Sequence, residues 1–106
     1  MLRPIAISLT VPLLFYTTRA FAVDETPLAI SRGCLACHDV HETLAGPAYL
    51  SVAKRYGPKD KEKLVKKVLN GGAGSWGAAP MPANKDNGVT DADARRLVDW
   101  ILSLNG

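Results

Sequence analysis

The sequence predicts an all-α domain built from four short helices. Apolar residues recur at helical spacing in several segments, and residues that cap or stop helices stand at the ends of those segments. No segment shows the convincing alternation of apolar and polar residues that is typical of a half-buried strand. With 106 residues, the chain has room for one domain. Its formal charge of +3, with both signs interspersed, fits neither an arginine-rich nucleic-acid-binding protein nor a disordered chain.

The N-terminus has the layout of a secretory signal peptide. Arg3 supplies a positive charge, residues 5–16 are largely apolar, and Ala20–Phe21–Ala22 has the small-x-small form of a cleavage site. The apolar run is shorter than the ~20 residues that a membrane-spanning helix needs. We therefore expect a cleaved signal peptide at residues 1–22 and one exported domain at residues 23–106. An uncleaved N-terminal anchor is the alternative.

The first two predicted helices are short. Asp24 or Thr26 can cap the first helix, which leads into Gly33. We expect this glycine to let another backbone, that of the last helix, approach closely. The second helix follows Gly46–Pro47 and stops at Gly57. Its apolar face has the spacing i, i+3, i+4 and i+7 and consists of Tyr49, Val52, Ala53 and Tyr56.

The third and fourth predicted helices carry clearer signals. Asp60 caps the third, and Asn70–Gly71–Gly72 ends it. Thr90 caps the fourth, with two aspartates in the first turn, where a negative charge is favourable for the helix dipole. The apolar face of the third helix consists of Leu64, Val65, Val68 and Leu69, and that of the fourth consists of Ala94, Leu97, Val98, Ile101 and Leu104.

The stretch between these two helices, residues 71–87, is rich in glycine and contains two prolines, which excludes a regular element. A structureless loop of this length is unusual in a small domain. A domain of this size also buries only ~60–65% of its unfolded surface, so its core needs help from a disulfide, a metal or a cofactor. We therefore expect the loop to wrap a large apolar group that the polypeptide does not itself supply.

The sequence Cys34–Leu35–Ala36–Cys37–His38 has the C-x-x-C-H pattern of c-type haem attachment. Two thiols one helical turn apart can each add to a vinyl group of the same porphyrin, and the histidine that follows can coordinate the iron. A thioredoxin-like thiol pair would need a βαβ pattern. A zinc site would have only these three side chains and His41, all crowded together. A disulfide between the cysteines would close a loop too small to stabilise the fold. We therefore expect one haem c, attached through Cys34 and Cys37, with His38 as an iron ligand.

Met81 is the candidate for the sixth iron ligand. Methionine and histidine suit low-spin haem iron, and Met81 is the only methionine once the signal peptide is removed. Pro80 and Pro82 keep its segment extended and leave it without the apolar neighbours of a core methionine. His41 is the rival ligand, but it is too close in sequence to His38 to reach the opposite face of the ring. We expect His41 to face solvent.

With these residues in view, residues 24–104 resemble the small class I cytochromes c of bacteria, of the short, mono-haem periplasmic type that feeds denitrification and respiratory enzymes. The resemblance implies the cytochrome c fold, in which four short helices wrap around one covalently attached haem. The segments that carry it are Gly33–Cys34–Leu35–Ala36–Cys37–His38, Gly46–Pro47–Ala48–Tyr49, Asn70–Gly71–Gly72–Ala73–Gly74–Ser75–Trp76–Gly77, Pro80–Met81–Pro82 with Asn84, and Trp100–Ile101–Leu102–Ser103.

The resemblance also implies further haem-site residues. The carbonyl of Pro47 would accept the Nδ1 proton of the histidine ligand and thereby fix its tautomer. Asn84 would donate to the sulfur of the methionine ligand. Trp76 would hydrogen-bond a haem propionate, or else form only a wall of the pocket, and Lys67 stands where the family often has a basic propionate partner. The family often has an aromatic residue at the position of Ala29, which puts the tightness of the crossing between the first and last helices in doubt.

With both axial positions of the iron taken, no site is left for a substrate. The expected function is that of a soluble periplasmic electron carrier, not an enzyme. Its partners would be larger redox proteins such as quinol-cytochrome c reductase, nitrite reductase, an oxidase or a peroxidase. We expect the processed protein to be a monomer that binds no nucleic acid and has no stable membrane insertion. A haem enzyme or gas sensor and a thiol oxidoreductase are the alternatives. Basic residues either steer acidic partners or merely form solvated helix faces: Lys54, Arg55, Lys59, Lys61, Lys63, Lys66 and Lys67.

Overall fold

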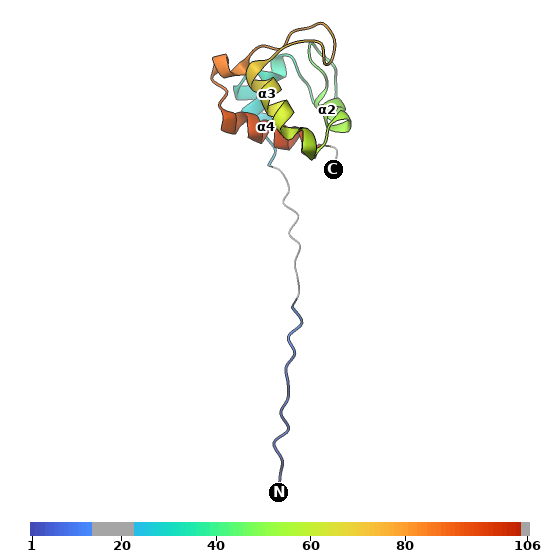
Figure 1. Cartoon of the computed structure of the whole chain (residues 1–106), viewed down its shortest axis with the longest axis vertical. Coiled ribbons are helices and arrows are strands. Elements are labelled where there is room, and N and C mark those ends of the chain that lie inside the picture. The colour runs from blue at the N-terminus through green and yellow to red at the C-terminus, as the bar shows by residue number, and fades with distance from the viewer. Residues whose placement is uncertain (14–22, 105–106) are drawn as a thin grey trace.

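Short helices, joined by long connections, make up the folded body of the chain (Figure 1). The computed structural model describes residues 1–13 and 23–104. Within these ranges there is no strand, and the only β-type pairing is a single antiparallel bridge between Gly72 and Met81. The predicted all-α class is therefore confirmed. The α-helices are α1 (Thr26–Ser31), α2 (Tyr49–Arg55), α3 (Lys61–Asn70) and α4 (Asp91–Ser103), and the one-turn 3₁₀ helices are η1 (Cys34–Ala36), η2 (Pro58–Asp60) and η3 (Asn84–Asn87).

Helix α1 begins at Thr26 after the N-cap residue Glu25, so the prediction that Asp24 or Thr26 is the cap is wrong, and the helix ends in a turn that only glycine adopts easily. The carboxylate of Asp24 accepts hydrogen bonds from the backbone N–H and the hydroxyl of Thr26, at 2.9 and 2.7 Å. Gly33 has a left-handed φ of 76° directly before η1. A Cβ atom placed at Gly33 would meet no atom within 4 Å, so the prediction that another backbone packs closely there is wrong. The chain needs the conformation of this glycine, not its small size.

The ends of α2 and α3 differ in detail from the sequence prediction. Helix α2 is one residue shorter than expected, because Tyr56 already has an extended backbone (φ −117°, ψ 155°). Asp60 directly precedes α3, as predicted, but its carboxylate bonds to no N–H of that helix. It accepts instead from the N–H of Gly57, at 3.0 Å, and so closes the turn of η2. The aspartate thus stabilises the approach to α3.

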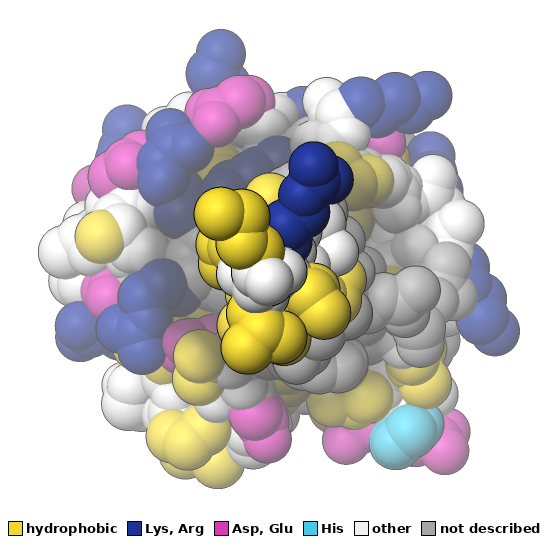
Figure 2. All heavy atoms as spheres, turned by 90° about the horizontal axis from the view of Figure 1, so that it is seen from below, with side chains coloured by type: hydrophobic (Ala, Val, Ile, Leu, Met, Phe, Trp, Pro, Cys, Tyr) yellow, Lys and Arg dark blue, Asp and Glu magenta, His cyan; other side chains and the backbone are white. Residues whose placement is uncertain are grey.

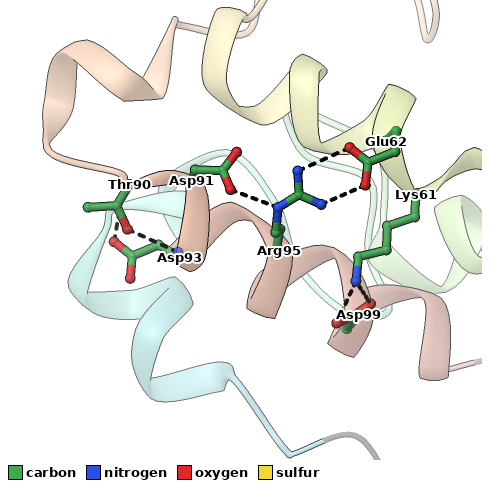
Figure 3. Close-up of polar contacts among 7 residues, drawn as sticks. All are labelled: Lys61, Glu62, Thr90, Asp91, Asp93, Arg95 and Asp99. Atoms are coloured by element: carbon green, nitrogen blue, oxygen red, sulfur yellow. Dashed lines mark hydrogen bonds and ion pairs between the residues drawn. The ribbon is translucent and has the colours of Figure 1, made fainter.

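Helix α4 is capped as predicted. The hydroxyl of Thr90 accepts from the N–H of Asp93 at 3.0 Å, and the Asp93 carboxylate accepts from the N–H of Thr90 at 3.2 Å (Figure 3). This reciprocal pair is a capping box. Figure 3 also shows α4 joined to α3, because Arg95 pairs with Glu62 at 2.6 Å and Lys61 pairs with Asp99 at 2.9 Å. Exposed pairs of this kind contribute little to stability, because water and salt screen the charges.

Two groups of buried side chains form the core. The first group joins α1, α2 and α4. The second group joins α3 to α4 and to the segment directly before α4. Ala29 is fully buried in the first group together with Trp100, which is 4% exposed. The large indole of Trp100 and the small side chain of Ala29 are thus buried in the same group at the α1–α4 crossing. The absence of an aromatic residue at position 29 does not leave this crossing open to solvent. The first group consists of Ala29, Tyr49, Leu97, Trp100 and Ile101, and the second of Val65, Val89, Ala94 and Val98.

The segment of residues 71–87 contains no α-helix, but its last four residues form η3. The prediction that this segment has no regular element is therefore wrong at Asn84–Asn87. At the other end, Gly71 has φ 68° and ψ −156° directly after α3. This backbone conformation is essentially restricted to glycine. It turns the chain out of the helix and into the loop.

Residues 1–13 have no regular secondary structure and extend away from the helices (Figure 1). Figure 2 looks along this extension from below and shows its hydrophobic side chains in front of the folded body. Those side chains are exposed. In the described ranges, no helix has both the length and the apolar character that crossing a bilayer requires. The predicted cleavage site, Ala20–Phe21–Ala22, lies outside the described residues, so the signal peptide stays a prediction.

Candidate functional site

The two cysteines lie on one tight turn. A 3₁₀ helix has 3.0 residues per turn, so side chains three positions apart lie over each other. Cys34 opens η1 and Cys37 directly follows it, and the N–H groups of Cys37 and His38 both donate to the carbonyl of Cys34, at 3.2 and 3.0 Å. The structure contains no disulfide between them, and both are free thiols. The turn therefore presents two thiols in the same direction and places the histidine immediately after them.

The imidazole of His38 is held in one orientation. Its Nδ1 lies 2.8 Å from the carbonyl oxygen of Pro47, and since a carbonyl can only accept, Nδ1 carries the proton and Nε2 keeps its lone pair. The ring also stacks on Tyr49, with ring centroids 4.8 Å apart and planes inclined by 21°. Gly46 lies so close that an added Cβ would be 2.8 Å from Nδ1. Only glycine at this position leaves room for the ring.

A deep pocket opens beside this histidine. The space in it that is free of protein atoms, with the open mouth included, is about 1330 Å³, and apolar side chains form much of its lining, as in the sites of large apolar ligands. Side chains of α3 and α4 and the glycine-rich segment form much of its wall. All the residues that sequence analysis placed at the haem site line this one pocket: Cys34, Cys37, His38, Pro47, Lys67, Trp76, Met81 and Asn84.

Met81 reaches the pocket on a paired segment of backbone. Its N–H donates to the carbonyl of Gly72 at 2.8 Å, and its carbonyl accepts from the N–H of Gly72 at 3.0 Å. Gly71 packs against the next residue, since an added Cβ would lie 2.6 Å from the carbonyl carbon of Pro82. The end of α3 and the methionine segment are thus fixed to each other at backbone level.

Asn84 is buried, and its side chain has a definite partner. Its Nδ2 donates to the carbonyl of Val68 at 3.0 Å, which ties η3 to the last turns of α3. No hydrogen bond joins Asn84 to the sulfur of Met81 among the interactions of the described residues. The amide has a second hydrogen, and its expected role toward the sulfur stays a prediction.

Trp76 forms a wall of the pocket and is 43% exposed. The guanidinium of Arg55 lies 4.6 Å from the centre of the indole ring and donates a 2.8 Å hydrogen bond to the carbonyl of Ser75. This contact was not predicted from the sequence, in which Arg55 is one of several basic residues expected at the surface. Arg55 and Ser75 are 20 positions apart, and no local pattern in the sequence links them. The propionate roles of Trp76 and Lys67 stay predictions.

The environment of Cys34 disfavours thiolate chemistry. Burial raises the pKa of the Cys34 thiol, and the pKa of the neighbouring Tyr49 phenol is also raised, chiefly by burial. Reactive thiols have lowered pKa values, so a thiol oxidoreductase does not fit. In the described part of the chain, no three His, Cys, Asp or Glu side chains form a group that could hold a metal ion. His41 is exposed, as expected.

The donor set and the pocket shape therefore suit one large apolar group held at a thiol pair. A comparison with known families agrees, because the family model described as cytochrome c matches residues 27–105. The chain belongs to the cytochrome c family. The cytochrome is accordingly a small electron carrier with one covalent haem c, it is not an enzyme, and its partners are redox proteins. Cys34, Cys37 and His38 make up its haem-attachment motif.

Individual cytochromes c are similar to this chain over most of their length. Cytochrome c-552 of Hydrogenobacter thermophilus is 49% identical over 79 residues, which are 73% of this chain and 78% of that protein. Cytochrome c2 of Rhodocyclus tenuis is 50% identical over 88 residues, 76% of this chain and 92% of that protein. The crystal structure of Nitrosomonas europaea cytochrome c552 matches with a TM-score of 0.66 and 41% identity, over 72% of this chain and 94% of that one. The predicted cytochrome c fold is thereby confirmed.

Proposed function

We propose that this cytochrome c is a soluble periplasmic protein that carries single electrons between larger respiratory or denitrification redox proteins, through a six-coordinate haem. The observation that carries the proposal is the pocket shared by His38 and Met81, two good iron donors from distant parts of the chain. The Nδ1 proton of His38 is committed to Pro47, so Nε2 is the nitrogen free to coordinate.

The chain's residues have distinct tasks in this proposal. Cys34 and Cys37 would hold the haem by thioether bonds, and His38 and Met81 would be the ligands of its iron. When bound, the haem supplies reversible exchange of one electron. The bond to Pro47 makes the imidazole a stronger donor, whereas the thioether of Met81 favours Fe(II) and raises the reduction potential.

Other pocket residues adjust the same equilibrium. Leu64, Val68 and Leu97 line the pocket and exclude water, which also favours the less charged, reduced state. With the haem bound, Asn84 would donate its second amide hydrogen to the Met81 sulfur, and Trp76 and Lys67 would bind the propionates.

The proposed location depends on the N-terminus. Residues 1–22 direct export and are removed, leaving a monomer of residues 23–106 that meets its partners in the periplasm. Quinol-cytochrome c reductase as donor, and nitrite reductase, an oxidase or a peroxidase as acceptor, are the proposed partner classes. The test is cell fractionation combined with the mass of the exported haem protein. Val23 is expected as its first residue, and a membrane-bound protein that retains residues 1–22 would show the uncleaved anchor instead.

Visible spectra of the exported, assembled protein test the iron ligands. The Fe(III) form is expected to show the weak methionine–iron charge-transfer band, and Met81→Ala is expected to abolish it. Leu64→Ala, which changes another residue of the pocket wall, should keep the band. Survival of the band in Met81→Ala would show that the ligand assignment is wrong. Ready binding of carbon monoxide by the wild-type Fe(II) form at neutral pH would indicate an open site, as in a gas sensor.

A further inference from the structure

The glycine-rich loop of residues 72–77 has few bonds of its own. Inside the loop, the N–H of Gly74 donates to the carbonyl of Gly77 at 2.9 Å. At its base, Gly72 pairs with Met81. Gly72, Gly74 and Gly77 all have positive φ values, from 102° to 125°. Since glycine gains the most conformational freedom when a loop opens, this loop needs an external contact to stay in one place.

Arg55, at the C-terminal end of α2, supplies such a contact. Its Nη1 donates to the carbonyl of Ser75 at 2.8 Å, and its guanidinium lies 4.6 Å from the ring centre of Trp76. This is the one side-chain hydrogen bond to residues 72–77 among those of the described chain. The guanidinium therefore holds both the backbone and the largest side chain of the loop.

Tyr56 extends this contact toward α3. Its ring lies edge-on to Trp76, with centroids 6.4 Å apart and planes inclined by 66°. The guanidinium of Arg55 is 5.3 Å from the Tyr56 ring centre, and Nζ of Lys63 is 5.4 Å from it. Two aromatic rings and two cations thus form one layer from α3 across α2 to the loop. Tyr56 and Trp76 in this layer both line the haem pocket.

We propose that Arg55 is a positioning residue that fastens the loop of residues 72–77 over the haem pocket and holds Trp76 in the pocket wall. The inference rests on the proposed function, because the loop then closes over the haem. Arginine suits this role: its planar guanidinium can stack on an indole while one of its N–H groups bonds a carbonyl. Loss of the contact loosens the loop and admits water, which lowers the reduction potential.

Hydrogen exchange in the reduced holoprotein tests the fastening directly. The variant Arg55→Gln should speed exchange of the Gly74 N–H by roughly tenfold, the ratio implied by losing one hydrogen bond to a charged group. The N–H groups in the middle of α4 should exchange at wild-type rates, because only the loop is loosened. The fluorescence of Trp76 should change, and the reduction potential should fall.

Lys54→Gln is the matched control. Lys54 precedes Arg55, is exposed, and has no hydrogen bond or ion pair among those of the described residues, so this variant makes the same change in net charge without touching the loop. Gly74 exchange should stay at the wild-type rate. The variant Arg55→Lys keeps the charge without the planar guanidinium, and its Gly74 exchange should remain faster than wild type.

Equal Gly74 exchange in Arg55→Gln and Lys54→Gln would overturn the proposal, as would equally fast exchange throughout α4 and the loop. Wild-type exchange in Arg55→Lys would show that charge alone suffices and would overturn the role given to the guanidinium. The methionine–iron band of the wild-type protein separates this inference from the proposed function. If the band is present and the loop is unaffected by Arg55, only the inference fails.

Discussion

The α3–α4 pair and the glycine-rich segment after α3 are neighbours in sequence, but different interactions hold them in place. Between α3 and α4, apolar side chains pack into a core, and ion pairs such as Arg95–Glu62 lie over its edge. The segment of residues 71–87 has little core of its own. Its shape comes from glycine conformations and from the bridge between Gly72 and Met81. Two single hydrogen bonds tie it to the helices, one from Arg55 of α2 to Ser75 and one from Asn84 to Val68 of α3.

This difference indicates which part of the molecule depends on the haem. The helical pair buries its apolar face against itself, so its stability comes from volume and packing. The loop lines the pocket, so its stability comes from backbone conformation and, once the haem is attached, from contact with that group. Substitutions that remove side-chain volume should therefore act on the helices, and substitutions that add a Cβ should act on the loop.

The largest expected effect is that of Leu97→Ala in α4. Leu97 is 2% exposed, belongs to the first core group and also lines the pocket. Its truncation should lower the free energy of unfolding by about 2–5 kcal/mol, because a cavity remains. Denaturant titration of the holoprotein measures this. Leu44→Ala, at a side chain that is 49% exposed, is the control and should cost less than about 0.5 kcal/mol.

The second effect tests the loop. Gly71→Ala adds a Cβ at φ 68° and ψ −156°, where it would lie 2.6 Å from the carbonyl carbon of Pro82. The backbone strain alone should cost about 1–3 kcal/mol, and the displaced segment should weaken the methionine–iron band. Gly57→Ala is the matched control, since its backbone is extended and an added Cβ meets nothing within 4 Å. Equal unfolding energies for the two variants would contradict the role given to the loop backbone.

A smaller effect is expected from the cap of α4. Thr90→Ala removes the acceptor of the Asp93 N–H and should lower the free energy of unfolding by about 1 kcal/mol. The methionine–iron band should not change, because this end of α4 lies away from the pocket lining. Thr43→Ala, at an exposed loop position, should leave stability unchanged. A shifted band in Thr90→Ala would show that helix and loop are coupled more closely than their contacts indicate.

The smallest effect concerns acid stability. Hydrogen bonds from Thr90 and the nearby charge of Arg32 hold the pKa of Asp93 below its ordinary value. A lowered pKa in the folded state stabilises above the unfolded pKa of ~3.9 and loses that contribution as the pH falls through the folded value. The stability difference between wild type and Asp93→Asn should therefore shrink as urea titrations move from pH 7 to acid. A difference that is constant with pH would show that the Asp93 charge contributes nothing.

Local patterns were enough to predict much of the fold. Helix α4 was predicted from Thr90, the acids after it and an apolar stripe, all within one helix, and the structure has the same cap and the same buried face. Cys34, Cys37, His38 and Met81 were predicted because C-x-x-C-H has few uses and Met81 has few competitors. The other pocket residues were predicted only from the family resemblance: Pro47, Lys67, Trp76 and Asn84. Predictions failed where a residue had a different partner: Asp60 bonds to Gly57 and not to α3, and Gly33 supplies a turn and not a close contact.

The sequence by itself determined the helical class and the attachment motif, and it predicts the two iron donors, because each depends on residues close in the chain or on a residue type that occurs rarely. Only the tertiary structure decided what surrounds them. Gly46 leaves room for His38, Asn84 bonds to Val68, and Arg55 reaches Ser75. These contacts join segments whose spacing follows no helical or strand period, so their partners are set by how the helices pack around the pocket.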